Sequence, residues 1–219
     1  MTKWWELLLG RAVSPSPSDR PAAVQLTVGG WTEEAAPGDL RAWRDRQGDV
    51  LTLSLSAPTG ALEMLREQAV KNARDLAESR HAGLIEVRFP TGPLGPVVSL
   101  IYKQLRKPAY IFTGMLLVPR EDHIWTVIAG ERGTTGVREA VITAELMNSG
   151  KLTFKNFERL WARDPYDPGY RGVDVSVLRF MSDDERYDER FPAHSLSKVR
   201  RILAALPGLV QLGSPGQKL

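Results

Sequence analysis

Residues 97–130, VVSLIYKQLRKPAYIFTGMLLVPREDHIWTVIAG, decide the fold of this chain. Together with the segment just before them, they predict four strands, at 84–89, 97–105, 109–118 and 124–130. A helix that opens at 133–136 follows these strands. Its apolar positions recur at helical spacing and predict a buried stripe of Val137, Ala140, Val141, Ala144 and Met147.

The later strands are apolar on both faces, whereas a half-buried strand alternates apolar and polar residues. The strand at 109–118 shows this most clearly, with Phe112 and Leu116 on one face and Ile111, Met115 and Leu117 on the other. Each face needs a cover, because monomers seldom expose large apolar patches. We therefore expect the C-terminal third of the chain to pack on this sheet.

The segments on either side complete the predicted fold. Residues 50–56 alternate as a half-buried strand and form a hairpin with an earlier one, and a helix follows with the stripe Leu62, Leu65, Ala69, Ala73 and Leu76. Downstream we expect a short helix at 151–162, a strand at 173–178, an acidic turn near 182–190 and a helix from Ser195 that stops at Pro207-Gly208. Its inward positions are Leu196, Val199, Leu203 and Leu206.

These elements predict an α+β fold: an antiparallel sheet of about six strands with helices packed on it, plus a C-terminal helical extension. Residues 1–23 are expected to form an apolar segment and a Ser/Pro linker, and residues 207–219 a flexible tail. Residues 24–206 are expected to form a single domain, with the extension at 151–206 packed on it.

Composition excludes several classes of site. The 219 residues include no cysteine, so disulfides, thiolate metal sites and a cysteine nucleophile are ruled out. The net charge is only +3 and the two signs are interleaved, which makes nucleic-acid binding unlikely. No apolar run reaches the roughly 20 residues that span a bilayer. We therefore expect a cytoplasmic protein without a membrane partner.

The search for chemistry yields no catalytic residue, no cofactor motif and no metal-binding pair. The three histidines are isolated in sequence, and no nucleophile elbow, Walker loop or dinucleotide fingerprint is present. One candidate ligand site lies at the turn from strand to helix, where free N–H groups can bind anions, although simple capping by Thr134 or Thr135 explains the same pattern. Its residues would be Glu131, Arg132, Thr134, Thr135, Arg138 and Glu139.

Two other clusters have both a functional and a plainer interpretation. The acidic residues Asp183, Asp184, Glu185, Asp188 and Glu189 could hold a hard cation, but a solvated face is the better interpretation. Apolar and aromatic residues outside the sheet could bind a partner or line a pocket, but docking on their own domain is the better interpretation, with the aromatic residues at 161–170 pinning their loop. These candidates are Trp4, Trp5, Leu8, Trp161, Tyr166 and Tyr170.

The order of hairpin, helix, antiparallel meander and helix resembles the PsbP-like α+β superfamily, which includes Ran-binding relatives and bacterial chaperones of type VI secretion effectors. The resemblance covers about Trp31 to Met147 and includes Gly48-Asp49-Val50, residues 110–114 and Glu131-Arg132. It implies a protein-binding or scaffolding role and assigns no binding residue. We expect a protein-binding module, such as a chaperone, adaptor or structural accessory, with a protein partner or self-association. The alternative is a small-ligand-binding protein or hydrolase that uses the turn at 131–139.

Overall fold

The computed structural model describes residues 24–26, 30–36, 41–46, 48–55, 66–92, 95–107, 109–118, 123–129 and 136–212. The predictions for residues 1–23, including Trp4, Trp5 and Leu8, lie outside this range. So do those for Glu131, Arg132, Thr134 and Thr135, and for the tail from residue 213.

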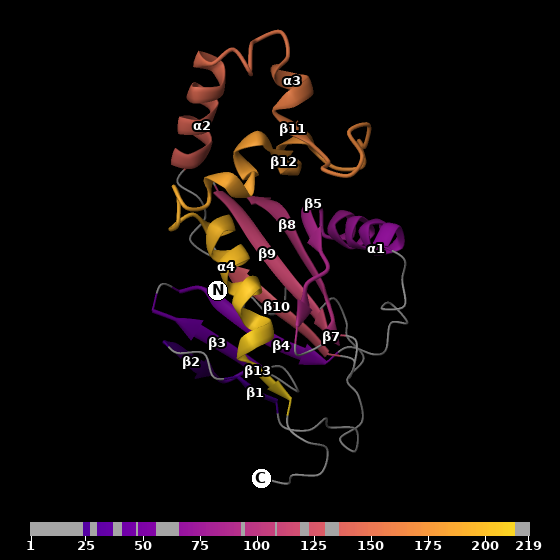
Figure 1. The fold of residues 1–219 in the computed structure, drawn as a ribbon, viewed down its shortest axis with the longest axis vertical. Helices are drawn as coiled ribbons and strands as arrows, with labels where there is room; N and C mark the ends of the chain where they lie inside the picture. The colour runs from indigo at the N-terminus through magenta and orange to yellow at the C-terminus, as the bar shows by residue number, and fades with distance from the viewer. Residues whose placement is uncertain are drawn as a thin grey trace.

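The structure combines helices with antiparallel sheets, so the predicted α+β class is confirmed. The main sheet has seven strands, all paired antiparallel, in the order β2-β3-β4-β10-β9-β8-β5 (Figure 1). Their bounds are β2 Trp31–Glu34, β3 Arg41–Asp45, β4 Val50–Leu55, β5 Gly83–Arg88, β8 Val98–Arg106, β9 Ala109–Val118 and β10 His123–Ala129.

Among the described residues, three two-stranded sheets lie apart from the main sheet, and their pairings were not predicted. They pair β1 (Val24–Leu26) with β13 (Val210–Leu212), β6 (Thr91–Gly92) with β7 (Gly95–Pro96), and β11 (Ala162–Arg163) with β12 (Arg179–Phe180). The strand predicted at 173–178 is wrong, because this segment forms the 3-10 helix η4 (Val175–Val177) before β12. Strands of two or three residues are too short to show periodicity in the sequence.

One face of the main sheet is covered by α4, Ser195–Leu209. Its buried residues Leu196, Val199, Leu203 and Leu206 share a core with side chains of β3, β4, β8 and β9, among them Trp43, Leu51, Phe112 and Leu116. The helix lies so close to β9 that a Cβ on Gly114 would stand 2.6 Å from Cγ1 of Val199. Pro207 lies inside the helix rather than ending it, so the predicted stop at Pro207-Gly208 is wrong.

The opposite face is covered by α1, Arg66–Ser79. Its Ala73 and Ala77 pack on Leu84 and Leu100 of the sheet, together with Tyr102, Val87 and Met115. Small residues let the helix approach the sheet closely. The two faces of β9 therefore find different covers, with Met115 under α1 and Phe112 under α4.

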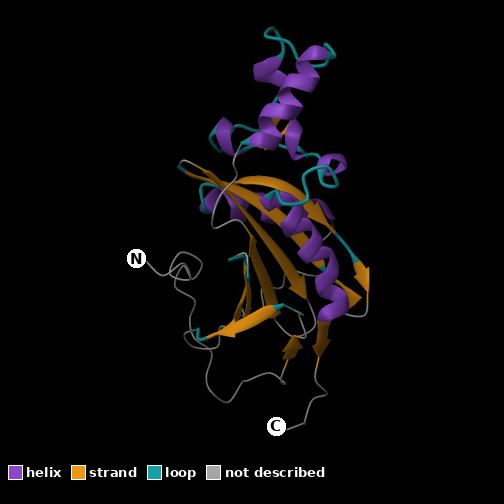
Figure 2. Cartoon of the chain, turned by 90° about the vertical axis from the view of Figure 1, so that its left-hand side faces the viewer, coloured by secondary structure: helices purple, strands orange, loops and turns teal. Residues whose placement is uncertain are grey.

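Residues 136–194 form what we call the lobe, which stands beyond one end of the main sheet (Figure 2). It contains α2 (Val137–Asn148), α3 (Phe157–Leu160), β11, η4, β12, η5 (Met181–Asp183) and η6 (Glu185–Tyr187). The helix predicted at 151–162 is reduced to the four residues of α3. Two small cores fill the lobe, one around Ile142, Leu146 and Leu152 and one around Ala162, Leu178 and Phe180.

The buried stripe predicted for α2 is wrong. The residues that α2 buries are Arg138, Ile142 and Leu146, whereas Val137 is 55% exposed. The reason is that α2 packs on the other elements of the lobe and turns a charged residue inward. The arginine is stabilised there by partners far along the chain.

This correction changes which substitution should be severe. We expect Ile142→Asp to lower the free energy of unfolding by more than about 3 kcal/mol, because it buries an unpaired carboxylate and removes a core side chain. Val141→Asp, on a half-buried position, should cost about 1 kcal/mol or less. Urea unfolding of both variants checks this. Equal losses would mean that α2 is rotated from its described position.

Candidate functional site

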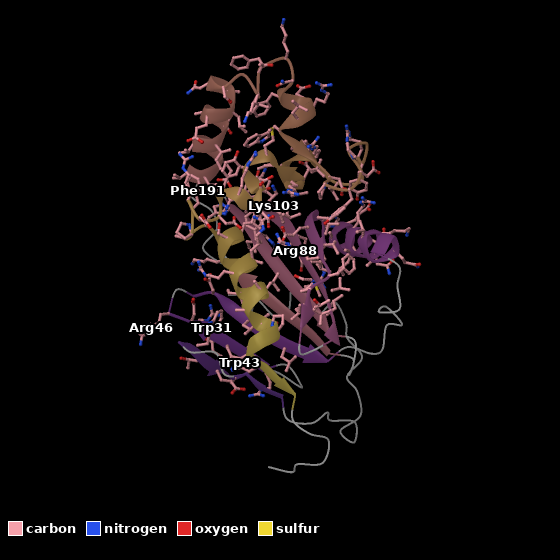
Figure 3. All side chains as sticks on the ribbon, viewed as in Figure 1. Trp31, Trp43, Arg46, Arg88, Lys103 and Phe191 are labelled. Atoms are coloured by element: carbon pink, nitrogen blue, oxygen red, sulfur yellow. The ribbon has the colours of Figure 1, made fainter. Side chains whose placement is uncertain are left out.

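Charged side chains from the sheet, the lobe and α4 meet at the end of the main sheet. We call this set the junction network. It contains Glu86, Lys103, Arg138, Glu139, Ser182, Asp183, Asp188, His194, Ser197 and Arg200. Figure 3 shows Lys103 at this end of the sheet, below the lobe, with Trp31 and Trp43 toward the other end.

Lys103 and Asp183 form a fully buried ion pair. Lys103 lies on β8 opposite Phe112 and therefore points to the α4 face of the sheet. Its Nζ donates to Oδ2 of Asp183 over 2.8 Å, and both side chains are at most 1% exposed. The same ammonium lies 3.3 Å from the ring centroid of Phe180, which adds a cation–π contact. Burial lowers the pKa of Lys103, while the charge of Asp183 acts against this shift.

Arg138 is a fully buried cation of the network with four hydrogen bonds. Its guanidinium donates to the carbonyl oxygens of Ser182 and Asp184, to Oδ1 of Asp188 and to Oγ of Ser197, over 2.7–2.9 Å. The side chain is 0% exposed. This residue of the predicted ligand site thus has its donors occupied by the protein itself.

Arg200 of α4 ties the same region to the sheet. It donates to Oε2 of Glu86 over 2.9 Å, to both carboxylate oxygens of Asp188 over 3.1 Å and to the carbonyl of Asp183 over 2.7 Å. Asp188 therefore lies between Arg138 and Arg200. Each charge is compensated within the network.

Glu139, the neighbouring residue of the predicted ligand site, pairs with His194. Oε1 of Glu139 lies 3.1 Å from Nε2 of the histidine, and its Oε2 is buried without a hydrogen bond among the described residues. Burial raises the pKa of Glu139, but the hydrogen bond and charge of His194 outweigh burial, and the resulting pKa is lower than usual. The helix itself is capped by Gly136 at φ 75°, with no side-chain cap.

The acidic cluster is only in part the solvated face that the sequence suggested. Asp183 is fully buried against Lys103, and Asp188 is about one-fifth exposed between two arginines. Within the described ranges, no three acidic or histidine side chains are grouped so that they could hold a metal ion. Asp183 and Asp188 thus compensate buried cations, whereas Glu185 and Glu189 are exposed.

The network predicts a pH dependence through Asp188. Burial raises its pKa, but Arg200, Arg138 and Ser197 outweigh burial and hold the pKa below its ordinary value of 3.8. At acid pH the unfolded chain therefore binds more protons than the folded chain. The contribution of Asp188 to the free energy of unfolding is complete above about pH 5, and it is lost as pH falls through the folded-state pKa. We expect Asp188→Asn to be less stable at pH 7 and to lose less stability between pH 5 and 3. Urea titrations at several pH values test this, and an unchanged slope would contradict it.

The aromatic residues predicted to line a pocket or to pin a loop do the latter. The hydroxyl of Tyr166 bonds the backbone of Val87 on β5. The hydroxyl of Tyr170 donates to Oε2 of Glu78 on α1 over 2.8 Å, and burial together with this carboxylate raises the pKa of Tyr170 to about 12. Trp161 stacks between Phe157 and Phe180 inside the lobe.

A cavity of about 340 Å³ lies in the lobe beside this pinned loop. Its lining combines three arginines, two aspartates and five apolar or proline side chains: Arg163, Arg179, Arg186, Asp164, Asp184, Leu160, Pro165, Pro168, Phe180 and Met181. The sequence analysis did not identify this cavity. Lys103, Arg138 and the other cations of the junction network do not line it.

The tip of the lobe, the loop at 149–156 between α2 and α3, exposes an aromatic side chain. Phe154 is 93% exposed, more than any other large apolar residue that the structure describes. Lys151 and Lys155, also exposed, lie on either side of it in sequence.

Comparison of the chain with models of protein families, with curated proteins and with solved structures gives no match. The resemblance to the PsbP-like superfamily therefore stays a prediction. In the described part of the chain, no helix combines the length and the apolar character needed to cross a membrane.

Proposed function

We propose that this chain is a protein-binding module, an adaptor or accessory that contacts its partner through the tip of the lobe. The observation that supports this proposal is the 93% exposure of Phe154. An aromatic side chain left in water gives up about 1.5–3 kcal/mol of burial free energy, which a partner could recover. Aromatic residues are also enriched at the centres of protein interfaces.

The loop that carries Phe154 is held in one conformation by the residues around it. Leu152 is 1% exposed in the core of the lobe, and its N–H donates to the carbonyl of Leu146 over 3.0 Å. Oδ1 of Asn156 accepts from the N–H of Thr153 over 2.7 Å. An anchor on such a fixed support loses little conformational entropy on binding, which favours affinity.

The lysines beside Phe154 define the chemistry of the partner. Lys151 and Lys155 are exposed on either side of the aromatic residue, and Arg159 on α3 adds a further exposed cation nearby in sequence. A complementary surface would hold an apolar pocket for the ring and acidic side chains around its rim. We propose an acidic protein surface of this kind as the partner.

The proposal can be tested with a photo-crosslinking amino acid at position 154 in cells of the native host. We expect it to capture one dominant protein, and the same group at Val175, which is 59% exposed elsewhere on the lobe, serves as the matched control. Phe154→Ser should weaken binding of that protein by about thirtyfold or more, as loss of an interface anchor does. A dominant product that is a second copy of this chain would assign the tip to self-association. Equal capture at both positions would refute the proposal.

The alternative, a ligand-binding protein or hydrolase at the turn 131–139, has less support. Arg138 donates four hydrogen bonds to protein acceptors, and Glu139 is paired with His194. A side chain whose N–H groups already donate to acceptors of its own protein is poorly suited to bind a substrate. The cytoplasmic location remains a proposal as well.

A further inference from the structure

We infer that the lobe cavity binds a phosphate monoester with an apolar or aromatic body, independently of the function proposed for Phe154. Two arginines that line the cavity face each other across a strand pair. Arg163 on β11 and Arg179 on β12 are direct partners in the antiparallel register, and both line the cavity. Side chains directly opposite each other point to the same face and lie close together, and like charges in this arrangement destabilise the strand pair. An anion between the two would remove this repulsion.

The guanidinium groups of the three arginines in the lining keep their hydrogen-bond donors available. Those of Arg163, Arg179 and Arg186 donate no hydrogen bond to any residue that the structure describes. Asp184 lies 3.7 Å from both Arg179 and Arg186, beyond the range of a hydrogen bond. By contrast, Arg74 donates to Asp164 over 2.9 Å in the usual charge-assisted geometry.

The side chains that line the cavity carry an excess of positive charge. The carboxylate of Asp164 is already compensated, because it pairs with Arg74 and accepts the N–H groups of Tyr166 and Asp167 over 2.8 Å. Three arginines therefore stand against Asp184 alone. A phosphate monoester, with a charge of about −1.5 to −2 at pH 7, matches this excess better than a carboxylate does. Guanidinium groups also suit the bidentate geometry of phosphate oxygens.

The apolar part of the lining defines the body of the ligand. Leu160, Phe180 and Met181 face the cavity with Pro165 and Pro168. Its volume of about 340 Å³ lies at the lower end of the roughly 300–1,000 Å³ of small-molecule sites, enough for a phosphate group and one ring. Inorganic phosphate would leave these apolar surfaces uncovered.

Calorimetric titration of the full chain with phenyl phosphate, inorganic phosphate and benzoate tests the inference. We expect one phenyl phosphate per chain, with weaker binding of inorganic phosphate and of benzoate. Arg163→Gln and Arg179→Gln should each weaken phenyl phosphate about tenfold or more, since each removes a charge-assisted contact. Arg106→Gln, an exposed arginine at the end of β8 that does not line the cavity, is the control and should bind like the unaltered chain.

Thermal melting provides a second measurement that separates loss of binding from loss of folding. Without ligand, Arg179→Gln should melt no lower than the unaltered chain, because it removes one of two facing like charges. Phenyl phosphate should raise the melting temperature of the unaltered chain and of Arg106→Gln, but not that of the Arg163→Gln/Arg179→Gln double variant. The inference is overturned if phenyl phosphate shows no saturable binding, if benzoate binds as tightly, or if the double variant binds as the unaltered chain does.

Discussion

Lys103→Met should lower the free energy of unfolding by about 3–5 kcal/mol, the cost typical of breaking a buried ion pair by removing one partner. The substitution leaves the carboxylate of Asp183 fully buried. Its Oδ2 would keep only the N–H of Phe180, at 2.8 Å, and its Oδ1 already has no hydrogen bond within the described residues. Urea unfolding followed by circular dichroism measures the loss.

The matched control is an exposed pair with the same chemistry and length. Lys71 and Asp75 on α1 also lie 2.8 Å apart, but their side chains are 70% and 55% exposed. Lys71→Met should therefore cost only about 0.5 kcal/mol or less. Similar losses for the two lysine variants would show that the Lys103 pair is hydrated in solution.

A double variant separates the charge of Asp183 from its hydrogen bond. Asn at position 183 is neutral and can still accept the N–H of Phe180, so Lys103→Met/Asp183→Asn should be more stable than Lys103→Met alone. If the double variant is the less stable of the two, the cost of Lys103→Met comes from the lost side-chain packing on Phe180. The contact of Lys103 with this ring, at 3.3 Å, makes that comparison necessary.

The main sheet could be predicted from the sequence because its signal is local. Residues 109–118 alternate between two apolar faces, and the structure places Phe112 and Met115 in two separate cores. The stripe of α4 was predicted correctly for the same reason, since Leu196, Val199, Leu203 and Leu206 recur at helical spacing. Periodicity reports which residues share a face, and here each face packs on an apolar partner.

The lobe could not be predicted in this way, because long-range ionic contacts decide its structure. Arg138 is buried by groups that lie 44 to 59 residues further along the chain, so no local pattern shows that α2 turns it inward. Apolar spacing then assigned the wrong stripe to this helix. The register that brings Arg163 opposite Arg179 likewise depends on two strands of two residues each.

One signal of the junction network was available in the sequence. Lys103 stands between Ile101 and Leu105 on one face of the strand LIYKQL, where an apolar residue would continue the pattern. A charged residue at an inward position of such a strand requires a buried partner of opposite charge. The crowded aspartates at 183–188 could have supplied this partner for Lys103. So many carboxylates need either water or compensating cations around them.

A chain that ends at Ala193, and so lacks α4, should fail to form a stable monomer. Four large apolar residues of α4 and their partners on the sheet, including Phe112, Leu116 and Leu51, would lose their burial. At about 1.5–3 kcal/mol for each buried side chain, this loss is as large as the roughly 5–15 kcal/mol that stabilise a typical domain. The same truncation removes Arg200, one of the two arginines that pair with Glu86 in the described part of the chain.

The matched control ends at Leu212 and keeps both α4 and β13. We expect this chain to melt like the full-length protein, because it keeps every element that the structure describes. Light scattering after size exclusion, with thermal melting, compares the three chains. Aggregation of the chain ending at Ala193, together with normal behaviour of the control, would establish that α4 covers the sheet in solution. A monomeric fragment that melts cooperatively near the full-length temperature would contradict this, and the α4 face of β9 would then need another cover.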